Sequence, residues 1–167
     1  MALPSLPDMQ SAAVLTERFR SKGLKVTPQR QLLFRLLEGN ESHPSAEALF
    51  AVASAQMPGI SLRTVYQTLH DLAEMGELQM LDLGTGAARF DPNLDDHHHL
   101  VCDECGHIRD VAVPGADGLA PAGDTQGFEV NAAQIVFRGL CASCRAQRPA
   151  ATADSGFAPT PSSVSNQ

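Results

Sequence analysis

The 167-residue sequence has no long hydrophobic run: no stretch approaches the roughly 20 apolar residues that a membrane-spanning helix needs. Residues 1–15 also lack the basic and apolar segments of a secretory signal. These absences argue against a membrane protein and predict a cytoplasmic one. Cysteine is scarce as well, with only four residues. Because the cytosol keeps thiols reduced, these four favour metal-binding thiolates over disulfides.

Basic residues are in the minority, with 12 Lys and Arg against 19 Asp and Glu and a net charge of −7. This average argues against a nucleic-acid partner, because polyanions attract basic surfaces. The charge is unevenly distributed, however. Residues 16–35 contain a single acid, Glu17, and six basic residues: Arg18, Arg20, Lys22, Lys25, Arg30 and Arg35. Because just over half of the acidic residues follow Asp82, the sequence is compatible with DNA binding by its N-terminal part only.

The first 80 residues are predicted to be helical. Apolar residues recur there at the three-to-four spacing of a buried stripe, and capping hydroxyls precede the predicted helices. Three of these helices run from Thr27 to Gly39, from Ser45 to Pro58 and from Ser61 to Gly76. Pro28 strengthens the first of these starts, because proline suits the first position of a helix.

The helix predicted after Ser61 has two distinct faces. Its apolar face consists of Leu62, Val65, Leu69 and Leu72, and the opposite face of Arg63, Gln67, His70 and Glu74, with Tyr66 on the flank. Such a polar face is more often an ordinary solvated surface. Here the helices precede "LQMLDLGTGAARFD", which alternates apolar residues and turns at Gly84-Thr85-Gly86. This order predicts a winged helix-turn-helix in which the polar face reads DNA and the hairpin is the wing.

After Asp91 the pattern changes to short strands. They are predicted at His97–Val101, Ile108–Val113 and Gln134–Leu140, and the Gly- and Pro-rich residues 114–127 fit at most a short helix. We therefore predict an α+β fold: a winged-helix DNA-binding domain in residues 1–86, a hinge at 87–92 and a small metal-binding α/β dimerisation domain at 93–146. The low-complexity residues 147–167 are predicted to be a disordered tail.

Two Cys-x-x-Cys motifs, Cys102 with Cys105 and Cys141 with Cys144, each lie at the end of a predicted strand. Four thiolates placed in this way can surround Zn(II) tetrahedrally at ~2.3 Å. We expect a structural zinc site rather than a redox-active dithiol pair, because two such motifs without a spare ligand suit zinc better than disulfide exchange.

The histidines near the first motif need a separate explanation. His97 and His99 share one side of the predicted strand, whereas His98 points away. Asp91 precedes them, and Asp110 lies on the next predicted strand, which a hairpin would bring near. A lone histidine is usually an ordinary surface or core residue. Two imidazoles with two carboxylates instead favour a metal site that suits Fe(II), Mn(II) or Zn(II) better than a thiol-binding metal.

Taken together, the sequence resembles the ferric uptake regulator (Fur) family of bacterial metal-dependent repressors. The similar segments are "KVTPQR", "HPSAEALF", "SLRTVYQTLHDLAEMGEL", "ARFD", "DDHHHLVCDECGHIRDV" and "FRGLCASC", within residues 13–145. The resemblance implies a homodimer with an N-terminal winged helix, a short hinge and a C-terminal α/β dimerisation domain. It also implies that Cys102, Cys105, Cys141 and Cys144 hold the structural zinc.

The resemblance adds a fifth ligand, His43, to the regulatory site. With Asp91, His97, His99 and Asp110 it matches the peroxide-sensing PerR-type subgroup, whereas iron-sensing relatives commonly have glutamate at one or both carboxylate positions. The two aspartates therefore favour peroxide sensing through bound Fe(II) or Mn(II). In that subgroup the resemblance implies that peroxide and Fe(II) add oxygen to His43 or His97.

The sequence departs from the family pattern in its C-terminal part. A further metal site of some members uses a histidine where this chain has Asn131-Ala132-Ala133. His98 and Asp96, its other possible ligands, therefore lack a partner and are not expected to bind metal. The helix usually found before the last strand is shortened and glycine-rich here. His70 and His107 match no ligand of the family.

We therefore predict a homodimeric repressor of double-stranded operator DNA whose metal acts as a corepressor. A metal that bridges the two parts stabilises the arrangement with both reading helices at operator spacing. The residues expected to contact DNA are Ser61, Arg63, Thr64, Tyr66 and Gln67, with Lys25 and Arg30 on phosphates.

Three alternatives remain open. An iron, manganese or other metal-uptake regulator without peroxide sensing would keep the same ligands. A metal-dependent enzyme would need a substrate pocket with a general base, which no motif marks. A dimerisation module that is held together by zinc and binds only protein would not explain the basic residues of the helical part.

Overall fold

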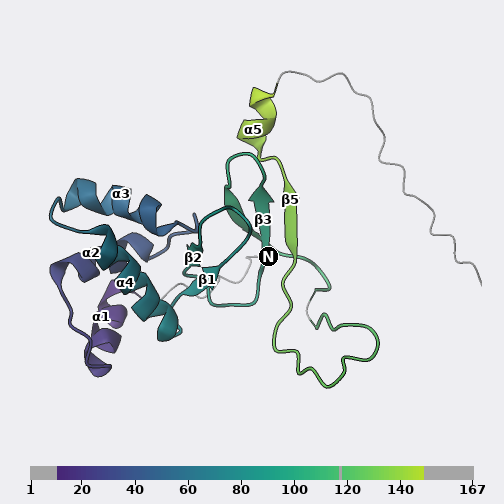
Figure 1. Ribbon diagram of the computed structural model, residues 1–167, viewed down its shortest axis with the longest axis horizontal. Helices are drawn as coiled ribbons and strands as arrows, with labels where there is room; N and C mark the ends of the chain where they lie inside the picture. The colour runs from purple at the N-terminus through teal and green to yellow at the C-terminus, as the bar shows by residue number, and fades with distance from the viewer. Residues whose placement is uncertain (1–10, 117, 149–167) are drawn as a thin grey trace, which may run out of the picture.

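The structure, a computed structural model, describes residues 11–116 and 118–148 and has an α+β fold in which helices come first and strands follow (Figure 1). The helices are α1 (Ala12–Ser21), α2 (Pro28–Leu37), α3 (Ala46–Gln56), α4 (Leu62–Glu74) and α5 (Ala142–Gln147). The strands are β1 (Gln79–Leu81), β2 (Arg89–Asp91), β3 (His98–Cys102), β4 (Ile108–Val111) and β5 (Val136–Gly139). None of the described helices is both long enough and apolar enough to cross a membrane.

The first four helices begin where hydroxyl side chains cap them. In each, a side-chain oxygen accepts a hydrogen bond from the backbone N–H three residues later, and the capping residues are Ser11, Thr27, Ser45 and Ser61. The three helix starts predicted from capping residues are therefore confirmed. Gly39, with φ of 64°, follows the end of α2, as its predicted role as a helix stop requires.

The helices α1 to α4 enclose one hydrophobic core. Val65, Leu69 and Leu72 of α4 are completely buried in it, which confirms these three residues of the predicted apolar face, whereas Leu62 is half-buried. Thr68 and Asp71 of the same helix are also buried, although their polarity suggested an outward position. Because α4 packs against both α2 and α3, its buried face is wider than a single leucine stripe.

The antiparallel hairpin of β1 and β2 lies between the helices and the remaining strands (Figure 1). Phe90 packs into the helical core, whereas Leu81 and Leu83 pack with Val101 and Ile108 in a second, smaller core. The boundary predicted at residue 86 lies in the turn of this hairpin, after which the chain returns as β2. The segment predicted as a hinge, residues 87–92, holds a paired strand with a buried phenylalanine.

The second sheet has the order β4-β3-β5, with β3 antiparallel to β4 and parallel to β5. All three strands were predicted, with bounds that differ by up to two residues at either end. The register places His99 opposite Asp110 and Cys102 opposite Gly139. A single strand, β3, therefore carries ligands for two different sites.

The C-terminal part differs from prediction in two places. Between β4 and β5 the described residues form no helix or strand, so even the short helix that the sequence allowed there is absent. A short helix that was not predicted, α5, instead follows Cys141 and reaches Gln147, the first residue of the predicted tail. Of that tail, residues 149–167 lie outside the described residues.

Candidate metal centres

The four cysteines converge at the end of the second sheet. Their sulfur atoms all lie within 4.8 Å of one another, and none of the four forms a disulfide. The sulfurs of Cys105 and Cys141 are 3.8 Å apart, far beyond the ~2.05 Å of a disulfide bond. Two ligands of a tetrahedral zinc at ~2.3 Å are separated by about 3.8 Å. The cysteines therefore fit a closed four-thiolate zinc site.

Parallel pairing of β3 and β5 brings the two motifs together. Asp103 N–H donates to the carbonyl of Gly139 at 2.8 Å, and Cys141 N–H donates to Cys102 Sγ at 3.3 Å. Backbone N–H groups of Cys105 and Cys141 lower the pKa of Cys102 to about 6. Side-chain contacts with Cys105 and Cys141 raise the pKa of Cys144. One thiol is thus ready to bind as a thiolate, whereas crowding keeps another protonated unless a cation neutralises the cluster.

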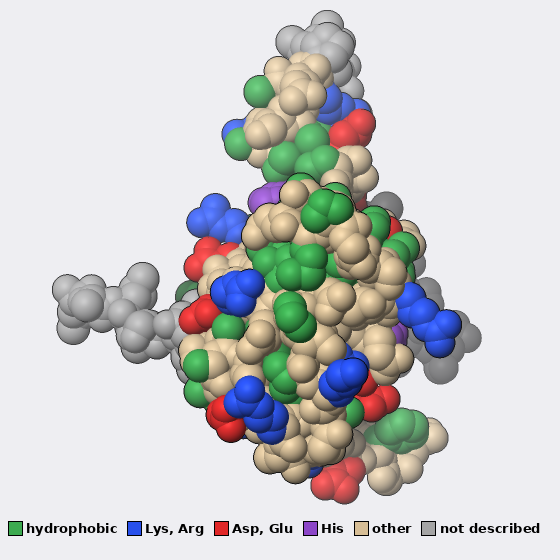
Figure 2. All heavy atoms as spheres, turned by 90° about the vertical axis from the view of Figure 1, so that its left-hand side faces the viewer, with side chains coloured by type: hydrophobic (Ala, Val, Ile, Leu, Met, Phe, Trp, Pro, Cys, Tyr) green, Lys and Arg blue, Asp and Glu red, His purple; other side chains and the backbone are tan. Residues whose placement is uncertain are grey.

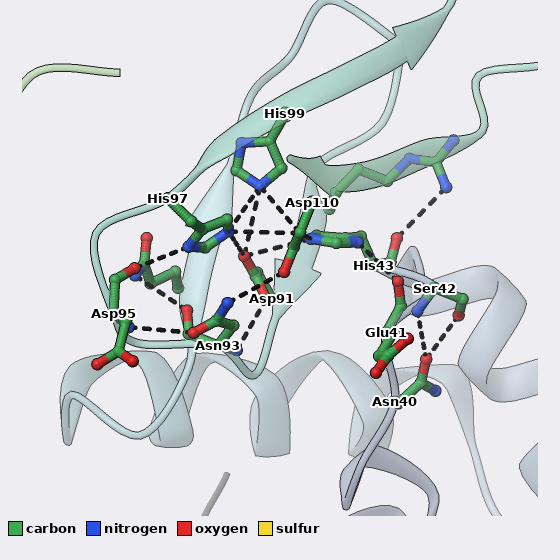
Figure 3. A network of polar contacts seen from close by, with 12 residues as sticks. Asn40, Glu41, Ser42, His43, Asp91, Asn93, Asp95, His97, His99 and Asp110 are labelled. Carbon is green, nitrogen blue, oxygen red and sulfur yellow. Dashed lines mark hydrogen bonds and ion pairs between the residues drawn. The ribbon is translucent and has the colours of Figure 1, made fainter. Parts of the chain in front are cut away.

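A second cluster joins the helical and strand-rich parts of the molecule (Figure 3). Its members are His43 from the α2–α3 connection, Asp91 at the end of β2, His97 just before β3, His99 in β3 and Asp110 in β4. One donor atom of each lies within 4.8 Å of all the others. Every residue expected for the regulatory site is therefore in one place, including His43, which only the family resemblance had indicated.

The donor atoms approach a common point, and among them the Nε2 atoms of His97 and His99 lie 2.9 Å apart, within hydrogen-bond distance of each other. Imidazole Nε2 atoms and carboxylate oxygens lie 2.7 to 3.7 Å apart across the cluster. Nevertheless, within the described residues the buried atoms His43 Nε2, Asp91 Oδ2 and Asp110 Oδ1 have no hydrogen bond of good geometry. Ligands at about 2.1 Å from one ion are separated by about 3.0 to 3.4 Å. This orphaned, convergent N/O set fits a divalent metal such as Fe(II) or Mn(II).

Neighbouring polar groups orient the ligands. Nδ1 of His43 lies 3.0 Å from the carbonyl of Glu41, and Nδ1 of His97 lies 2.7 Å from the carbonyl of Asp95. A proton on each Nδ1 leaves the Nε2 lone pair directed into the cluster. Figure 3 also shows Asn93, which the sequence analysis missed.

Asn93 contacts both carboxylates of the cluster. Its side-chain Nδ2 donates to Asp110 Oδ2 at 3.0 Å, and its backbone N–H donates to Asp91 Oδ1 at 2.8 Å. It lies in an Asp-Pro-Asn turn directly after β2. That turn was the available signal, since asparagine and aspartate there bond to nearby backbone. Asn93 therefore holds one oxygen of each carboxylate and leaves the other facing the cluster.

The electrostatics of the metal-free cluster are strongly coupled. Burial raises the pKa of Asp91, but the surrounding imidazoles of His43, His97 and His99 outweigh it and hold the pKa well below its usual range. Burial lowers the pKa of His97, whereas Asp91 and the Asp95 carbonyl raise it to a final value of about 9. The pKa of His43 is raised as well, because Asp91 and Asp110 outweigh burial. Protons thus take the place of a cation until a metal displaces them.

His43 is held in an unusual backbone conformation. It is almost completely buried with φ of 48°, a region that residues other than glycine rarely adopt. The guanidinium of Arg89 contacts its carbonyl at 3.5 Å and donates to the carbonyl of Gly106 at 3.1 Å. Arg89, also missed by the sequence analysis, therefore links the loop of His43 to the turn between Cys102 and Ile108.

The remaining histidines stay outside the cluster. His98 is buried on the other side of β3, where its Nδ1 accepts a hydrogen bond from Ile135 N–H at 3.2 Å. Asp96, His70 and His107 are exposed and belong to neither group of convergent ligands.

Most of the residues expected at DNA are exposed. Ser61, Arg63, Tyr66 and Gln67 are exposed on α4 or at its start, and Thr64 is half-buried beside Ser61. Lys25 is exposed. Arg30, in contrast, is only 15% exposed and forms an ion pair with Asp71.

These features define a metal-binding α+β protein with one thiolate site and one nitrogen/oxygen site. Residues 21–138 match the ferric uptake regulator family, and the chain belongs to that family. It is 33% identical to the peroxide-responsive repressor PerR of Staphylococcus epidermidis over 127 residues, 75% of this chain and 85% of the relative. It is 32% identical to the peroxide operon regulator of Bacillus subtilis over 129 residues, 77% of this chain and 89% of the relative.

Solved structures share the fold. The ferric uptake regulator of Helicobacter pylori aligns with a TM-score of 0.67 at 19% identity, covering 83% of this chain and 96% of that chain. The ferric uptake regulator of Francisella tularensis, determined with iron, aligns with a TM-score of 0.61 at 26% identity, covering 74% of this chain and 96% of that chain. The chain is accordingly a transcriptional regulator and not an enzyme.

Proposed function

We propose that the chain is a metal-dependent DNA-binding repressor that senses peroxide through Fe(II) in the cluster of His43, Asp91, His97, His99 and Asp110. Mn(II) can take the place of the iron, and Cys102, Cys105, Cys141 and Cys144 hold a structural Zn(II). The observation that carries this proposal is the origin of the five donors, because His43 comes from the helical part and His99 and Asp110 from the second sheet.

Such a site couples metal binding to the arrangement of the two parts. A ligand set that is complete only when the helices lie against the sheet binds metal only in that arrangement, so metal stabilises it. The occupied site then fixes the orientation of α4 relative to the sheet. Metal acts as a corepressor if that orientation is the one that fits the operator.

The DNA-binding part comprises α2, α3, α4 and the hairpin, which together form a winged helix-turn-helix. In this arrangement α4 enters the major groove of double-stranded operator DNA and the hairpin contacts the backbone. The contact residues are Ser61, Arg63, Thr64, Tyr66 and Gln67, with Lys25 on a phosphate. Figure 2 shows basic side chains spread over the helical end, with acidic side chains among them.

The second sheet serves as the dimerisation part. Leu100 of β3 and Phe137 of β5 are exposed by 43% and 42%, and they line a cavity of about 570 Å³ on that sheet. Two copies related by a twofold axis would cover these apolar side chains and set two α4 helices at half-site spacing.

Peroxide sensing depends on oxidation near the metal. Bound Fe(II) supplies the reducing centre for hydrogen peroxide, and the buried imidazoles of His43 and His97 are within reach as targets. The net change is transfer of one oxygen atom from peroxide to an imidazole ring, with water as the second product. The modified ring binds metal more weakly, and the repressor is released.

The repressor function can be tested by measuring how the protein binds a DNA duplex that it selects from a random pool in the presence of Mn(II). We expect a retarded complex in gel shift assays with Mn(II) or anaerobic Fe(II), and its loss with chelator. Equal binding with and without metal would overturn the corepressor role.

Mass spectrometry tests the peroxide function separately. Protein loaded with Fe(II) and treated with hydrogen peroxide should gain one oxygen on the peptide containing His43 or His97 and lose operator binding, whereas Mn(II)-loaded protein should not. Unmodified peptides with unchanged DNA affinity would leave a regulator of iron or manganese uptake that does not sense peroxide.

A further inference from the structure

A buried carboxylate on the inner side of α4 connects two residues that the sequence assigned to DNA. Asp71 is 7% exposed. One of its oxygens lies 2.6 Å from Arg30 Nη2, and the other accepts a hydrogen bond from Gln67 Nε2 at 2.8 Å. Asp71 thus ties the start of α2 to the exposed face of α4.

The guanidinium of Arg30 is occupied within the protein. Besides Asp71, it donates to the carbonyl of Lys25 at 3.0 Å, and it lies 5.2 Å above the ring of Phe19. An arginine that binds DNA phosphates needs guanidinium N–H groups exposed at the protein surface. The side chain of Arg30 is instead largely buried, and a carboxylate neutralises its charge. Arg30 therefore holds α2 against α4, and the expectation that it contacts a phosphate does not fit its position.

The contact with Asp71 also fixes the amide of Gln67. A carboxylate only accepts hydrogen bonds, so the NH₂ group of Gln67 must face inward and its carbonyl oxygen outward. One N–H and the oxygen remain free at the surface. This donor and acceptor pair matches the N7 and N6 positions of adenine in the major groove.

We propose that Asp71 is a positioning residue for base recognition: it neutralises Arg30 inside the fold and holds Gln67 in the orientation that reads an A·T pair. This inference rests on the proposed DNA-binding function. Operator binding by the wild-type chain with Mn(II) tests that function, and the variants below are compared only with that binding.

The first experiment measures how operator affinity changes with salt in the Arg30→Met/Asp71→Asn double variant, which leaves no unpaired buried charge. Loss of one phosphate contact reduces the slope of log affinity against log salt by about 0.9. We expect the double variant to keep the wild-type slope and Lys25→Gln, the exposed control, to lose about that amount. A double variant that loses the same amount as the control would show that Arg30 contacts DNA and overturn the internal role.

The second experiment measures affinity for operators with each base pair substituted in turn, in wild type, Gln67→Ala and Asp71→Asn. We expect that, in Gln67→Ala, substituting one particular A·T pair no longer lowers affinity. In Asp71→Asn, the affinity loss caused by substituting that same pair should be reduced at least about fivefold, and the affinity losses at the other positions should stay unchanged. Gln56→Ala, which changes an exposed residue at the end of α3, should leave the affinity loss at every position unchanged. The proposal would be overturned if Asp71→Asn weakened binding equally for all operators, or if Gln67→Ala changed the base preference at no position.

Discussion

The two metal clusters are built from ligands of very different origin. The four cysteines form two short motifs joined by the pairing of neighbouring strands, so the site lies entirely within the C-terminal part. The five donors of the other cluster come from the α2–α3 connection, the hairpin and the second sheet. The first site can stabilise one part of the molecule, whereas the second can report how two parts are arranged.

The two clusters are nevertheless mechanically connected. β3 carries His99 near its start and Cys102 at its end, and Arg89 links the carbonyl of His43 to that of Gly106 in the turn after Cys102. The regulatory site should therefore depend on the zinc site, but the zinc site should not depend on the regulatory site. Loss of zinc should damage both sites, whereas loss of the regulatory metal should leave the zinc site intact.

The largest effect is expected from Cys102→Ser, which removes a zinc ligand. Zinc content should fall from stoichiometric to near zero, and stability by at least about 4 kcal/mol, or about 10 °C or more in Tm. Mn(II) binding should be lost with it. Elemental analysis and thermal unfolding measure these changes, with exposed Ser143→Ala in the second Cys-x-x-Cys motif as the control. Full Mn(II) affinity without zinc would contradict the one-way dependence.

His43→Ala should weaken Mn(II) binding at least about 100-fold, because it removes the ligand from the helical part. Zinc content should stay close to wild type, whereas the metal-free protein should lose stability because the carboxylates of Asp91 and Asp110 lose a buried cationic partner. Isothermal titration with Mn(II) measures the loss, and exposed His107→Ala is the matched control. Unchanged Mn(II) affinity would mean that the site does not bridge the two parts.

Mn(II) affinity should rise with pH by about tenfold per unit between about pH 6.5 and 9, since His97, with a pKa of about 9, must lose its proton to bind metal. The metal-free protein should behave in the opposite sense. Because folding raises the pKa of His97, its contribution to stability is complete below about pH 6.5 and is lost as pH rises toward 9. Titrations and denaturant unfolding across this range measure both trends. Affinity independent of pH would show that His97 is already neutral.

The smallest effect is expected from Asn93→Ala, which removes the hydrogen bond to Asp110 but no ligand. Mn(II) affinity should fall by about 10-fold to 100-fold, and zinc content should not change. Competition titrations measure this difference, with exposed Asn131→Ala as the control. An effect as large as that of His43→Ala would place Asn93 among the ligands themselves.

Some features could be predicted from sequence because they depend on nearby residues. Hydroxyl caps located the starts of three helices, and the two-residue periodicity of a strand separated His97 and His99 from His98. The two Cys-x-x-Cys motifs were sufficient to predict the four-thiolate zinc site. Family resemblance was needed for His43, since it lies far along the chain from the other ligands and no spacing rule connects them.

Other features could not be predicted, because the deciding contacts join distant segments. Arg30 was expected to bind a phosphate, yet Arg30 and Asp71 neutralise each other between α2 and α4. The turn at Gly84-Thr85-Gly86 predicted the hairpin, but the predicted hinge was placed over its second strand, β2, which pairs with β1. In both cases a partner from elsewhere in the chain changed the preferred position of the residue.

The sequence by itself determined which segments are helices and strands and which residues can bind metal, because capping, periodicity and ligand chemistry act over a few residues. Only the tertiary structure decided that one imidazole from the helical part meets two carboxylates and two imidazoles around a common point. The physical reason is that burial and ion pairing depend on what packs alongside, and packing brings together groups that chain order keeps apart.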